Sequence, residues 1–263
     1  MDTKIAIIGG GNLGTAIAKG LVKSNFTAQN IFVTRRKIEF LYELQAQEIN
    51  ITSSNPEAVK NSEVIILTLK PYKTDKILEE IAPYIEKDKH LILSMVSGVS
   101  IEHIKSIVKT EIPVFRAMPN TAIAINQSMT CIAAPNAKNG HKELMKTMFS
   151  NLGETVFMNE EMMDAATVLA ACGIAFVMRF IRAMVQGGIE IGFDAKTASQ
   201  IANQTVKGAA ELLIQNGLHP EQEIDKVTTP KGYTISGLNE MEHNGFSSSL
   251  IKGILLSFNK MGE

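Results

Sequence analysis

The first residues whose spacing suggests chemistry are the glycines of IIGGGNLG. Gly9, Gly11 and Gly14 form the pattern G-x-G-x-x-G between an apolar run, KIAIIG, and an amphipathic stretch. In such a turn the first glycine allows a tight bend, the second lets a pyrophosphate approach the backbone, and the third lets helix and strand pack closely. The following helix presents free N–H groups and a partial positive charge to phosphates. The strand-to-helix context makes the pattern informative, and it predicts a dinucleotide site.

The second such stretch is VTRRK (33–37), about 20 residues after the turn, where NAD-binding folds carry an acidic side chain. This chain has Thr34, Arg35 and Arg36 there instead. A carboxylate would bind a free ribose 2′-hydroxyl and repel a 2′-phosphate, whereas guanidinium groups pair well with phosphate. The stretch therefore favours NADPH as the cofactor, with weaker use of NADH. The alternative is a solvated basic loop.

Three further segments follow apolar runs, and they are TLKPY (68–72), SMVSG (94–98) and RAMPNTA (116–122). Ligands of open parallel sheets bind outside the carboxyl ends of the strands, so these segments are candidates to line a site. Lys70 and Pro71 end a run with a forced turn, whose backbone can flank a cofactor ribose. Asn120 and Thr121 are polar groups in an apolar stretch. Ordinary loop chemistry explains each segment equally well when it is taken alone.

Two other polar positions leave two interpretations open. Asn55 stands before Pro56 and either caps a helix or faces an adenosine. The stretch KVTTPKGYTISGL (226–238) gathers threonines and a serine around Pro230 and Gly232. Such a cluster usually only opens a helix, but exposed N–H groups at a helix start can also hold a carboxylate substrate.

Short apolar runs alternate with amphipathic stretches over the first 158 residues. The runs that predict strands are 4–9, 30–34, 63–69, 90–96, 114–118, 129–134 and 154–158. The stretches that predict helices are 13–24, 37–47, 73–85, 100–108 and 138–151. This alternation indicates βαβ units and a parallel sheet. We therefore predict an α/β N-terminal Rossmann domain over residues 1–158 that binds NADP.

Strand-like runs stop after residue 158, and the rest of the chain is helical in pattern. The predicted helical segments are 160–192, which forms one or two helices, 195–215, 220–226, 231–243 and 247–260. Asp194 is a plausible N-cap of the second of these. The first is apolar around most of its circumference, so it is buried either within one chain or against another subunit. Residues 159–263 are therefore predicted to form an all-α dimerisation and substrate-binding domain.

Composition limits the partners of the chain. Its 263 residues carry a formal net charge of −1, which gives no reason to expect nucleic acid or a membrane surface. No run reaches the roughly 18 consecutive apolar residues of a membrane span. The start of the chain is unlike a signal peptide, and Cys131 and Cys172 suggest no disulfide framework, so we expect a cytoplasmic location and no metal. Five histidines lie in apparently polar surface segments and are expected to be structural: His90, His103, His141, His219 and His243.

Taken together along nearly the whole chain, these pieces resemble the pyrroline-5-carboxylate reductases. IIGGGNLGTAIAKGL looks like that family's opening turn, TLKPY resembles its A-V-K-P element, and RAMPNTA resembles its R-x-M-P-N-T-P loop. GGIEIGFDAKTASQIANQTVKGAAELL is similar to its dimerisation stretch, and VTTPKGYTISGLNEMEHNGF to its V-T-S-P-G-G-T-T-I-x-G-L…GF signature. One such motif would be weak evidence, whereas five in order are strong. The resemblance implies a Rossmann domain, a helical domain that pairs subunits into dimers that often assemble further, and reduction of 1-pyrroline-5-carboxylate to L-proline with NAD(P)H.

The resemblance also assigns roles to matching positions. The pyrophosphate would be held by Gly9, Gly11, Asn12, Leu13 and Gly14. The adenosine end would lie near Thr34, Arg35, Arg36 and Asn55. The ribose and nicotinamide would lie beside Thr68, Leu69, Lys70, Pro71, Met95, Val96 and Ser97. The substrate would contact Asn120, Glu160, Gly232, Tyr233 and Thr234. Of these, Thr234 would be the catalytic group, hydrogen-bonded to the imine nitrogen.

Two departures from the family pattern affect the substrate side. AACGIAF (170–176) stands where the family usually has S-G-S-G-P-A-Y, so serine hydroxyls are lost. Lys231 replaces the first glycine of P-G-G, and its side chain either helps to bind a carboxylate or blocks it.

The expected chemistry needs orientation more than acid catalysis, because a protonated imine is already electrophilic. A hydroxy-acid dehydrogenase on a similar plan would need a base, typically a lysine from the long interdomain helix. Residues 169–192 contain no lysine, and their cations, Arg179 and Arg182, stay protonated. The alternatives that remain are a related NADP-dependent imine or hydroxy-acid oxidoreductase and a non-catalytic NADP-binding paralogue.

Overall fold

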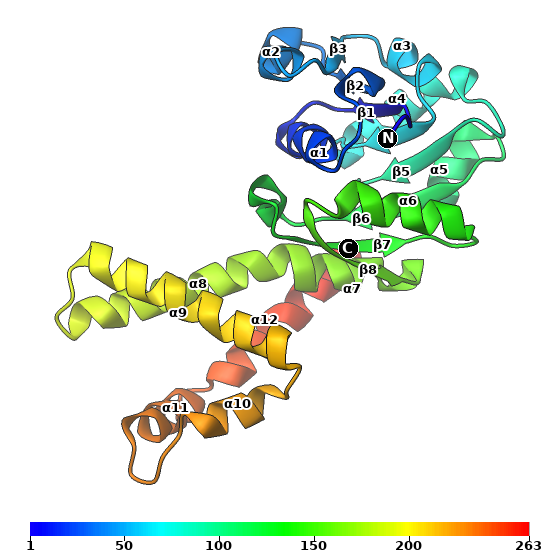
Figure 1. The fold of residues 1–263 in the computed structure, drawn as a ribbon. Helices are drawn as coiled ribbons and strands as arrows, with labels where there is room; N and C mark the ends of the chain where they lie inside the picture. Colours follow the sequence, from blue (N-terminus) through cyan, green and yellow to red (C-terminus); the bar gives the residue numbers. More distant parts are fainter. Residues whose placement is uncertain (263) are drawn as a thin grey trace. The chain divides into compact units, whose positions relative to one another are not determined.

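The computed structural model describes residues 1–262, and its contacts divide the chain into two units, with the division after Ala171. Unit 1 carries the strands of the described chain together with helices on both of their faces, and unit 2 is helical (Figure 1). The predicted fold class, a Rossmann domain followed by an all-α domain, is therefore confirmed.

Eight strands form a single sheet in unit 1. They are β1 (Ile5–Ile8), β2 (Ile31–Thr34), β3 (Asn50–Thr52), β4 (Val64–Leu67), β5 (Leu91–Ser94), β6 (Val114–Met118), β7 (Ser128–Ala133) and β8 (Gly153–Met158). Their order in space is β3-β2-β1-β4-β5-β6-β7-β8. The first six are parallel neighbours, whereas β7 runs antiparallel to β6 and β8 runs parallel to β7. The order 3-2-1-4-5-6 is that of dinucleotide-binding folds.

The helices follow most of the predicted ranges. Those of unit 1 are α1 (Asn12–Lys23), α2 (Tyr42–Gln45), α3 (Asn55–Lys60), α4 (Pro71–Ile81), α5 (Ile101–Val108), α6 (Asn139–Phe149) and α7 (Met163–Ala166). Those of unit 2 are α8 (Gly173–Glu190), α9 (Ala195–Asn216), α10 (Pro220–Lys226), α11 (Tyr233–His243) and α12 (Phe246–Asn259). A π-helical turn, Thr167–Cys172, lies between α7 and α8. The predicted N-cap of α9 is confirmed, because the Asp194 carboxylate accepts the N–H groups of Lys196 and Thr197, each at 3.0 Å.

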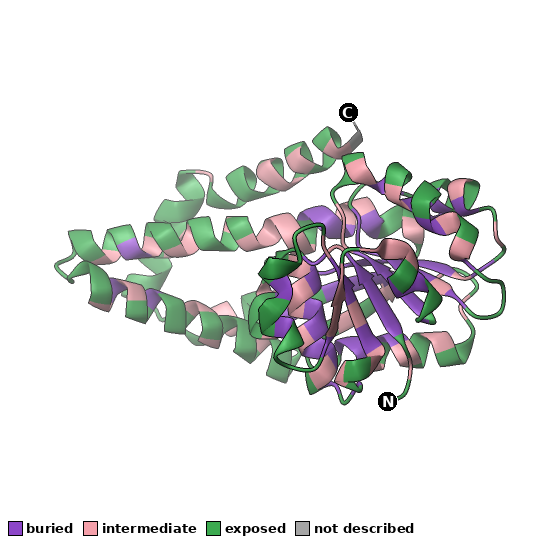
Figure 2. Ribbon diagram, turned by 90° about the horizontal axis from the view of Figure 1, so that it is seen from above, coloured by how far each residue is buried: buried purple, intermediate pink, exposed green. Residues whose placement is uncertain are grey.

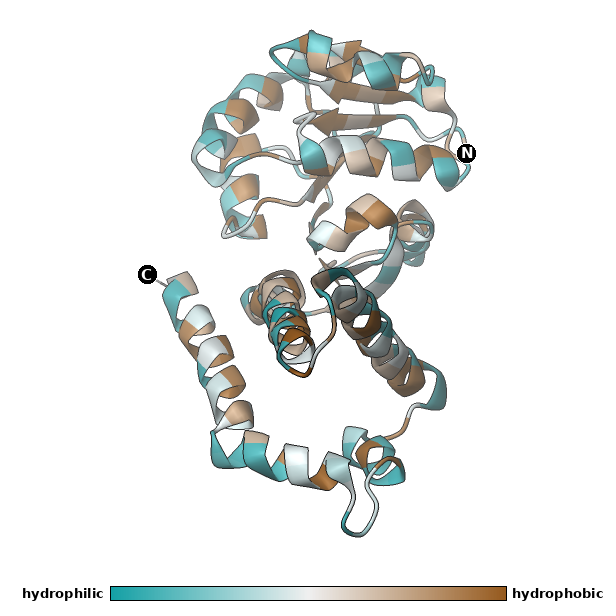
Figure 3. Ribbon diagram, turned by 90° about the vertical axis from the view of Figure 1, so that its left-hand side faces the viewer, coloured by the Kyte–Doolittle hydropathy of each residue, from teal (hydrophilic) through white to brown (hydrophobic). Residues whose placement is uncertain are grey.

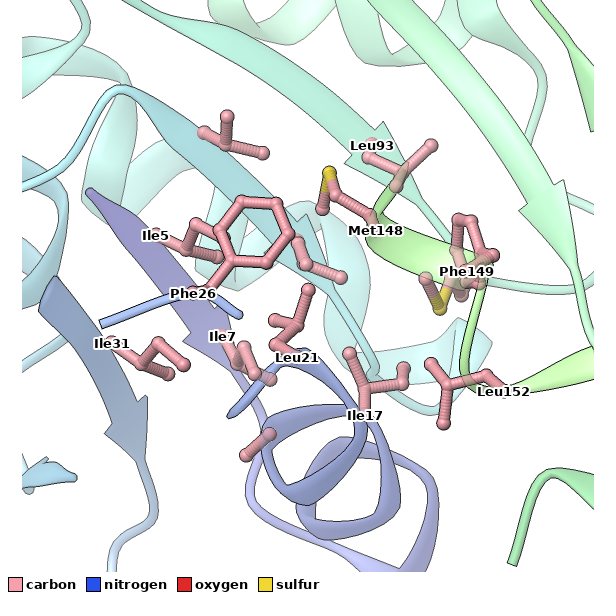
Figure 4. Close-up of a cluster of buried hydrophobic side chains, with 14 of the residues drawn as sticks. Ile5, Ile7, Ile17, Leu21, Phe26, Ile31, Leu93, Met148, Phe149 and Leu152 are labelled. Atoms are coloured by element: carbon pink, nitrogen blue, oxygen red, sulfur yellow. The ribbon is translucent and has the colours of Figure 1, made fainter. Parts of the chain in front are cut away.

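Alternation along the strands builds two apolar layers in unit 1. Ile5 and Ile7 of β1 face one layer, which contains α1 and α6 (Figure 4). Ala6 and Ile8 face the other layer, which contains α3, α4 and α5. Successive side chains of a strand point to opposite faces, so an uninterrupted apolar run is what a strand covered on both faces requires. The inner strands of the sheet are accordingly the most buried part of the chain (Figure 2), whereas the edge strands β3 and β8 are only partly buried.

The sequence did not predict two short elements of unit 1, β3 and α3. They have three and six residues, too few for a hydrophobic period to be recognised. The division between the units also falls after residue 171, whereas the sequence placed the domain boundary after residue 158. Residues 159–171 remain with unit 1 because Met163 and Ala166 pack against Met118 and Cys131.

One helical stretch of the described chain, Glu160–Glu190, is long and apolar enough in composition to cross a membrane. Its most apolar 18-residue window has a mean hydropathy of 2.0, and 11% of that window is buried. The expectation above counted uninterrupted apolar residues, and Arg179 and Arg182 interrupt this stretch without removing its high average hydropathy. A single such helix is weak evidence for a membrane, since apolar faces that pair protein subunits have the same composition.

His90 corrects the expectation that the histidines lie at the surface, because it is only 2% exposed. Its Nδ1 accepts the N–H of Glu86 at 2.8 Å, so the proton lies on Nε2, which donates to the carbonyl of Val59 at 3.1 Å. Burial lowers the pKa of the His90 ring, and the hydrogen bond to Val59 only partly opposes this effect.

This shift makes stability depend on pH in a defined direction. The unfolded chain binds a proton at His90 near pH 6.5, before the folded protein does, so the free energy of unfolding falls as pH decreases below about 6.5. One such group contributes at most about 1.4 kcal/mol per pH unit. Urea unfolding between pH 5 and 7.5 should show a shallower dependence for His90→Gln than for the parent. His243→Gln, at an exposed position, is the control; parallel curves for the parent and His90→Gln would contradict the assignment.

Candidate active site

The three glycines of the turn between β1 and α1 differ in what an added Cβ would contact. Gly9 has φ +117°, and a Cβ there would lie 2.6 Å from the carbonyl oxygen of Thr68. A Cβ at Gly14 would lie 2.2 Å from the carbonyl oxygen of Gly9. A Cβ at Gly11 would have no atom within 4 Å. The chain itself therefore requires glycine at positions 9 and 14, whereas Gly11 leaves a space that no part of the described chain fills.

Neighbouring strands hold this turn in place. The Thr68 hydroxyl, at the end of β4, donates to the carbonyl of Gly9 at 2.6 Å. The N–H of Gly10 donates to the carbonyl of Thr34 at 2.7 Å, and the N–H of Gly9 donates to the Thr34 hydroxyl at 3.3 Å. The ends of β2 and β4 thus fix both sides of the turn that ends β1.

The turn leads into α1 without a capping side chain, because its N-cap is Gly11. The N–H groups of Asn12, Leu13 and Gly14 in the first helical turn therefore lack a side-chain acceptor. Free N–H groups and the helix dipole together attract anions. The open space at Gly11 lies next to these groups, so a phosphate can approach them closely.

Thr34 and Asn55 form a buried support beside the turn. Thr34 is 2% exposed, and its hydroxyl donates to Asn55 Oδ1 at 2.7 Å. The Asn55 amide nitrogen then donates to the Glu80 carboxylate at 3.2 and 3.3 Å. Ser54, not Asn55, caps α3, since the Ser54 hydroxyl accepts the N–H of Glu57. The Thr34 hydroxyl is therefore engaged within the protein on both sides, and its predicted role at the 2′-phosphate stays a prediction.

Arg35 lies beside the turn and Arg36 extends away from it. One Arg35 nitrogen, NH1, donates to the carbonyl of Gly10 at 2.9 Å, and the Arg35 guanidinium carbon lies 4.3 Å from the centre of the Phe40 ring. Arg36 is exposed and has no partner within the described residues. The structure therefore brings one of the two predicted arginines to the glycine turn and leaves the other free.

The segments after β4 and β5 expose only some of their predicted ligands. Thr68 and Leu69 are half-buried, and Lys70 and Pro71 are exposed where α4 begins. After β5, Ser97 is exposed, whereas Met95 and Val96 are 4% and 1% exposed and pack in the apolar layers. Met95 and Val96 can reach a cofactor only through their backbone, because strand alternation directs their side chains into the core.

Asn120 is mostly buried, and its side-chain amide is hydrogen-bonded within unit 1. It is 8% exposed. Its Oδ1 accepts the N–H of Ala122 at 3.0 Å, and its Nδ2 donates to the carbonyl of Ala170 in the π-helical turn at 3.2 Å. Both ends of the amide are engaged within unit 1. The contact of Asn120 with the substrate stays a prediction.

Glu160 has a similar structural engagement. Its Oε1 accepts the backbone N–H of Ile101, at the start of α5, at 2.7 Å and Arg116 NH1 at 3.2 Å. Arg116 is 5% exposed, and its other nitrogens, Nε and NH2, have no hydrogen-bond partner; NH2 lies 3.8 Å from Asp164 Oδ1. A buried guanidinium needs a counter-charge, so Glu160 is required by Arg116. The contact of Glu160 with the substrate stays a prediction.

Arg116 and Glu160 line a pocket of unit 1 with a volume of about 620 Å³. Its charged and polar lining also includes Ser100, Lys142 and Asn159. Arg116 could have been found from the sequence, because a charged residue inside the apolar strand VFRAM is unusual unless the charge is paired. Phe40 and Glu80, which contact Arg35 and Asn55, had no recognisable sequence signal.

The predicted substrate residues Gly232, Tyr233 and Thr234 lie in unit 2, where α11 begins. The N–H of Gly232 donates to the carbonyl of Thr229 at 2.8 Å, and a Cβ at Gly232 would lie 2.5 Å from the Thr229 hydroxyl oxygen. Gly232 is the N-cap of α11 and offers no side chain, so the first N–H groups of the helix have no cap. Tyr233 is 99% exposed and Thr234 is also exposed.

Lys231, in the same loop, has a left-handed backbone conformation, with φ +59°. A non-glycine residue in that region costs about 1 kcal/mol relative to glycine. The lysine therefore keeps a backbone conformation that glycine adopts freely, at a small cost in stability. Its side chain is exposed.

Comparisons with known proteins match both units. Residues 4–98 match the family model described as NADP oxidoreductase, coenzyme F420-dependent, and residues 160–263 match the one described as pyrroline-5-carboxylate reductase dimerisation. Pyrroline-5-carboxylate reductase 2 of Dictyostelium discoideum is 44% identical over 279 residues, which covers 100% of this chain and 93% of that protein. Pyrroline-5-carboxylate reductase 1 of the same organism is 47% identical over 98% of this chain, which spans only 49% of that longer protein.

A solved structure agrees in fold. The Plasmodium falciparum pyrroline carboxylate reductase with NADP bound has a TM-score of 0.87 and 25% identity, covering 98% of this chain and 97% of that one. Its fold therefore matches the strand order and the helical domain described above. With 44% identity to a reductase over the whole length, the glycine turn in unit 1 and the dimerisation match in unit 2, the chain belongs to the pyrroline-5-carboxylate reductase family of oxidoreductases.

Proposed function

We propose that this chain reduces 1-pyrroline-5-carboxylate to L-proline, the last step of proline biosynthesis, with NADPH as the preferred reductant and NADH as a weaker one. The observation that best supports a dinucleotide cofactor is the space at Gly11, which the protein leaves open next to the uncapped N-terminus of α1. The choice of substrate rests on the membership of the chain in the pyrroline-5-carboxylate reductase family. The dinucleotide-bound relative from Plasmodium falciparum is further support.

When bound, NADPH supplies the hydride for the reaction. The chain's own residues bind and orient it: the first N–H groups of α1 take the pyrophosphate, and Arg35 takes the 2′-phosphate beside the glycine turn. Arg36 adds a second positive charge nearby. Thr34 and Asn55 act indirectly, since the hydrogen bonds from Gly9 through Thr34 to Asn55 fix the shape of the turn.

On the substrate side, the backbone N–H groups of Tyr233 and Thr234 bind the carboxylate, because α11 begins there without a capping side chain. The Thr234 hydroxyl orients the imine nitrogen. A protonated imine needs no further acid, so positioning accounts for the residue types at this loop. The left-handed Lys231 presents its cation from the same loop and favours a negatively charged substrate.

We also propose that the chain acts as a homodimer or a larger homo-oligomer in the cytoplasm. Among the described residues of unit 2, the apolar side chains that are buried are few: Val185, Ala198 and Ala202. Large apolar residues of its helices and their ends are exposed, including Ile191, which follows α8, at 78% and Ile214 of α9 at 76%. Figure 3 shows hydrophobic residues, in brown, recurring along the helices of this unit. Pairing two such domains would remove these apolar surfaces from water, which is strongly favourable.

A direct assay tests the proposed activity. Purified protein is mixed with NADPH and 1-pyrroline-5-carboxylate, and the loss of NADPH absorbance and the formation of proline are followed. Turnover with proline as product is expected. NADPH binding without turnover would favour the non-catalytic paralogue, and turnover only with 2-hydroxy or 3-hydroxy acids would favour the dehydrogenase alternative.

Replacing Thr234 by alanine should lower kcat about 10- to 100-fold, the size expected for one hydrogen bond to a charged group. The fold should be unaffected, because Thr234 is exposed and its hydroxyl has no partner within the described residues. Steady-state kinetics with saturating NADPH is the measurement, and Thr205→Ala on α9 is the control. Unchanged kinetics for Thr234→Ala would remove this residue from the mechanism.

A further inference from the structure

Phe40 is an exposed aromatic residue with one defined contact. It lies on the 3₁₀ turn Ile38–Leu41 that follows β2, and 59% of its surface is exposed. Its neighbour Leu41 is completely buried and fills the space beside Gly10, where a Cβ would lie 2.6 Å from a Leu41 methyl carbon. Leu41 therefore anchors the turn against the glycine turn, and Phe40 is held beside the same site.

The contact that Phe40 makes is with Arg35. The Phe40 ring lies 4.3 Å from the guanidinium carbon, and Arg35 NH1 donates to the carbonyl of Gly10 at 2.9 Å. The guanidinium is thus held by an aromatic face and a backbone carbonyl. These two contacts use one nitrogen and one face, so the remaining N–H groups are available to an anion.

A free arginine side chain loses rotamer entropy when it is ordered. If Arg35 is already ordered before the ligand arrives, less of this entropy is lost when the ligand binds. A cation–π contact at an exposed site shifts the population of an exposed side chain about 2- to 5-fold.

We propose that Phe40 is a positioning residue that sets the preference for a 2′-phosphorylated dinucleotide by holding Arg35 in its binding orientation. This inference rests on the proposed use of NADPH and names a determinant of that preference. Phe40 acts through Arg35 and does not itself bind the dinucleotide. Its effect should therefore depend on the 2′-phosphate and on the presence of Arg35.

The test is the Kd of NADPH and of NADH for the intact protein, from titrations that follow nucleotide fluorescence. Phe40→Ala and Phe40→Leu should each weaken NADPH binding about 5-fold and NADH binding less than 2-fold, in line with a cation–π contact plus side-chain ordering. Phe40→Tyr should leave the Kd of NADPH at the parent value because it keeps the aromatic face. Tyr42→Ala, which removes a nearby aromatic that is 55% exposed, should leave both values unchanged.

A double-mutant cycle gives the decisive comparison. Adding Phe40→Ala to an Arg35→Ala protein should change neither Kd further, because the residue acts through the arginine. Equal weakening of NADPH and NADH, or an effect that persists without Arg35, would mean that Phe40 stacks on the adenine and would overturn the proposal while leaving the cofactor assignment intact. Failure of the parent protein to bind NADPH would instead remove the proposed function, and this inference with it.

Discussion

A Gly11→Val variant should lose NADPH binding by more than about 100-fold and lose activity, yet remain folded. Gly11 has φ −86° and ψ −166°, an extended conformation that valine adopts readily, and its Cβ would meet no atom within 4 Å. The free energy of unfolding should fall by only about 0.5–1 kcal/mol, since valine is a poorer N-cap than glycine. The added side chain would fill the space that a pyrophosphate needs beside the N–H groups of α1. Fluorescence titration and urea unfolding measure the two effects separately.

Two other glycines serve as controls for this prediction. Gly14→Ala should destabilise the fold by about 2 kcal/mol or more, because its Cβ would lie 2.2 Å from the carbonyl oxygen of Gly9. Gly140→Val, at another position with open space around the Cβ, should not change NADPH binding. If Gly11→Val bound NADPH normally, the open space would not be a cofactor site.

The second large effect is expected for Arg35→Ala combined with Arg36→Ala, which should raise the KM for NADPH about 100-fold. Hydrogen bonds to a charged group are each worth about 1.5–3 kcal/mol, and 1.4 kcal/mol corresponds to a factor of ten. The KM for NADH should change less than about 3-fold, because NADH has no 2′-phosphate. Arg35→Ala should account for most of the effect, since Arg35 is held beside the glycine turn and Arg36 is exposed without a partner in the described chain.

Lys37→Ala, which removes the next exposed cation, is the matched control for general charge. Its effect on the KM for NADPH should be small and should disappear at high salt, as expected for a screened charge. Equal increases in KM for NADPH and NADH in the double variant would mean that VTRRK is only a solvated basic loop.

Much of the fold was available from local patterns. Continuous apolar runs such as IAII predicted strands covered on both faces, and the two apolar layers confirm this reading. β3 and α3 were missed because three and six residues are too few to show a period. The boundary after residue 171 depended on contacts of Met163 and Ala166 with strands far away in the sequence.

Some site residues were likewise predictable from the sequence, whereas the contacts of others became visible only in the structure. The spacing of Gly9, Gly11 and Gly14 was enough to predict the glycine turn. The sequence also predicted the role of the arginines after β2 and the family to which the chain belongs. Only the tertiary structure decided that Thr34, Asn120 and Glu160 are engaged in structural hydrogen bonds, because their partners are remote in the sequence.

The same physical reason applies to Arg35 and Phe40. A sequence shows which side chains are present, but the groups left free to bind a ligand are those that long-range packing has not already used. Spacing could place Arg35 near a phosphate, whereas the Phe40 ring and the Gly10 carbonyl that orient its guanidinium became visible only when the chain was folded.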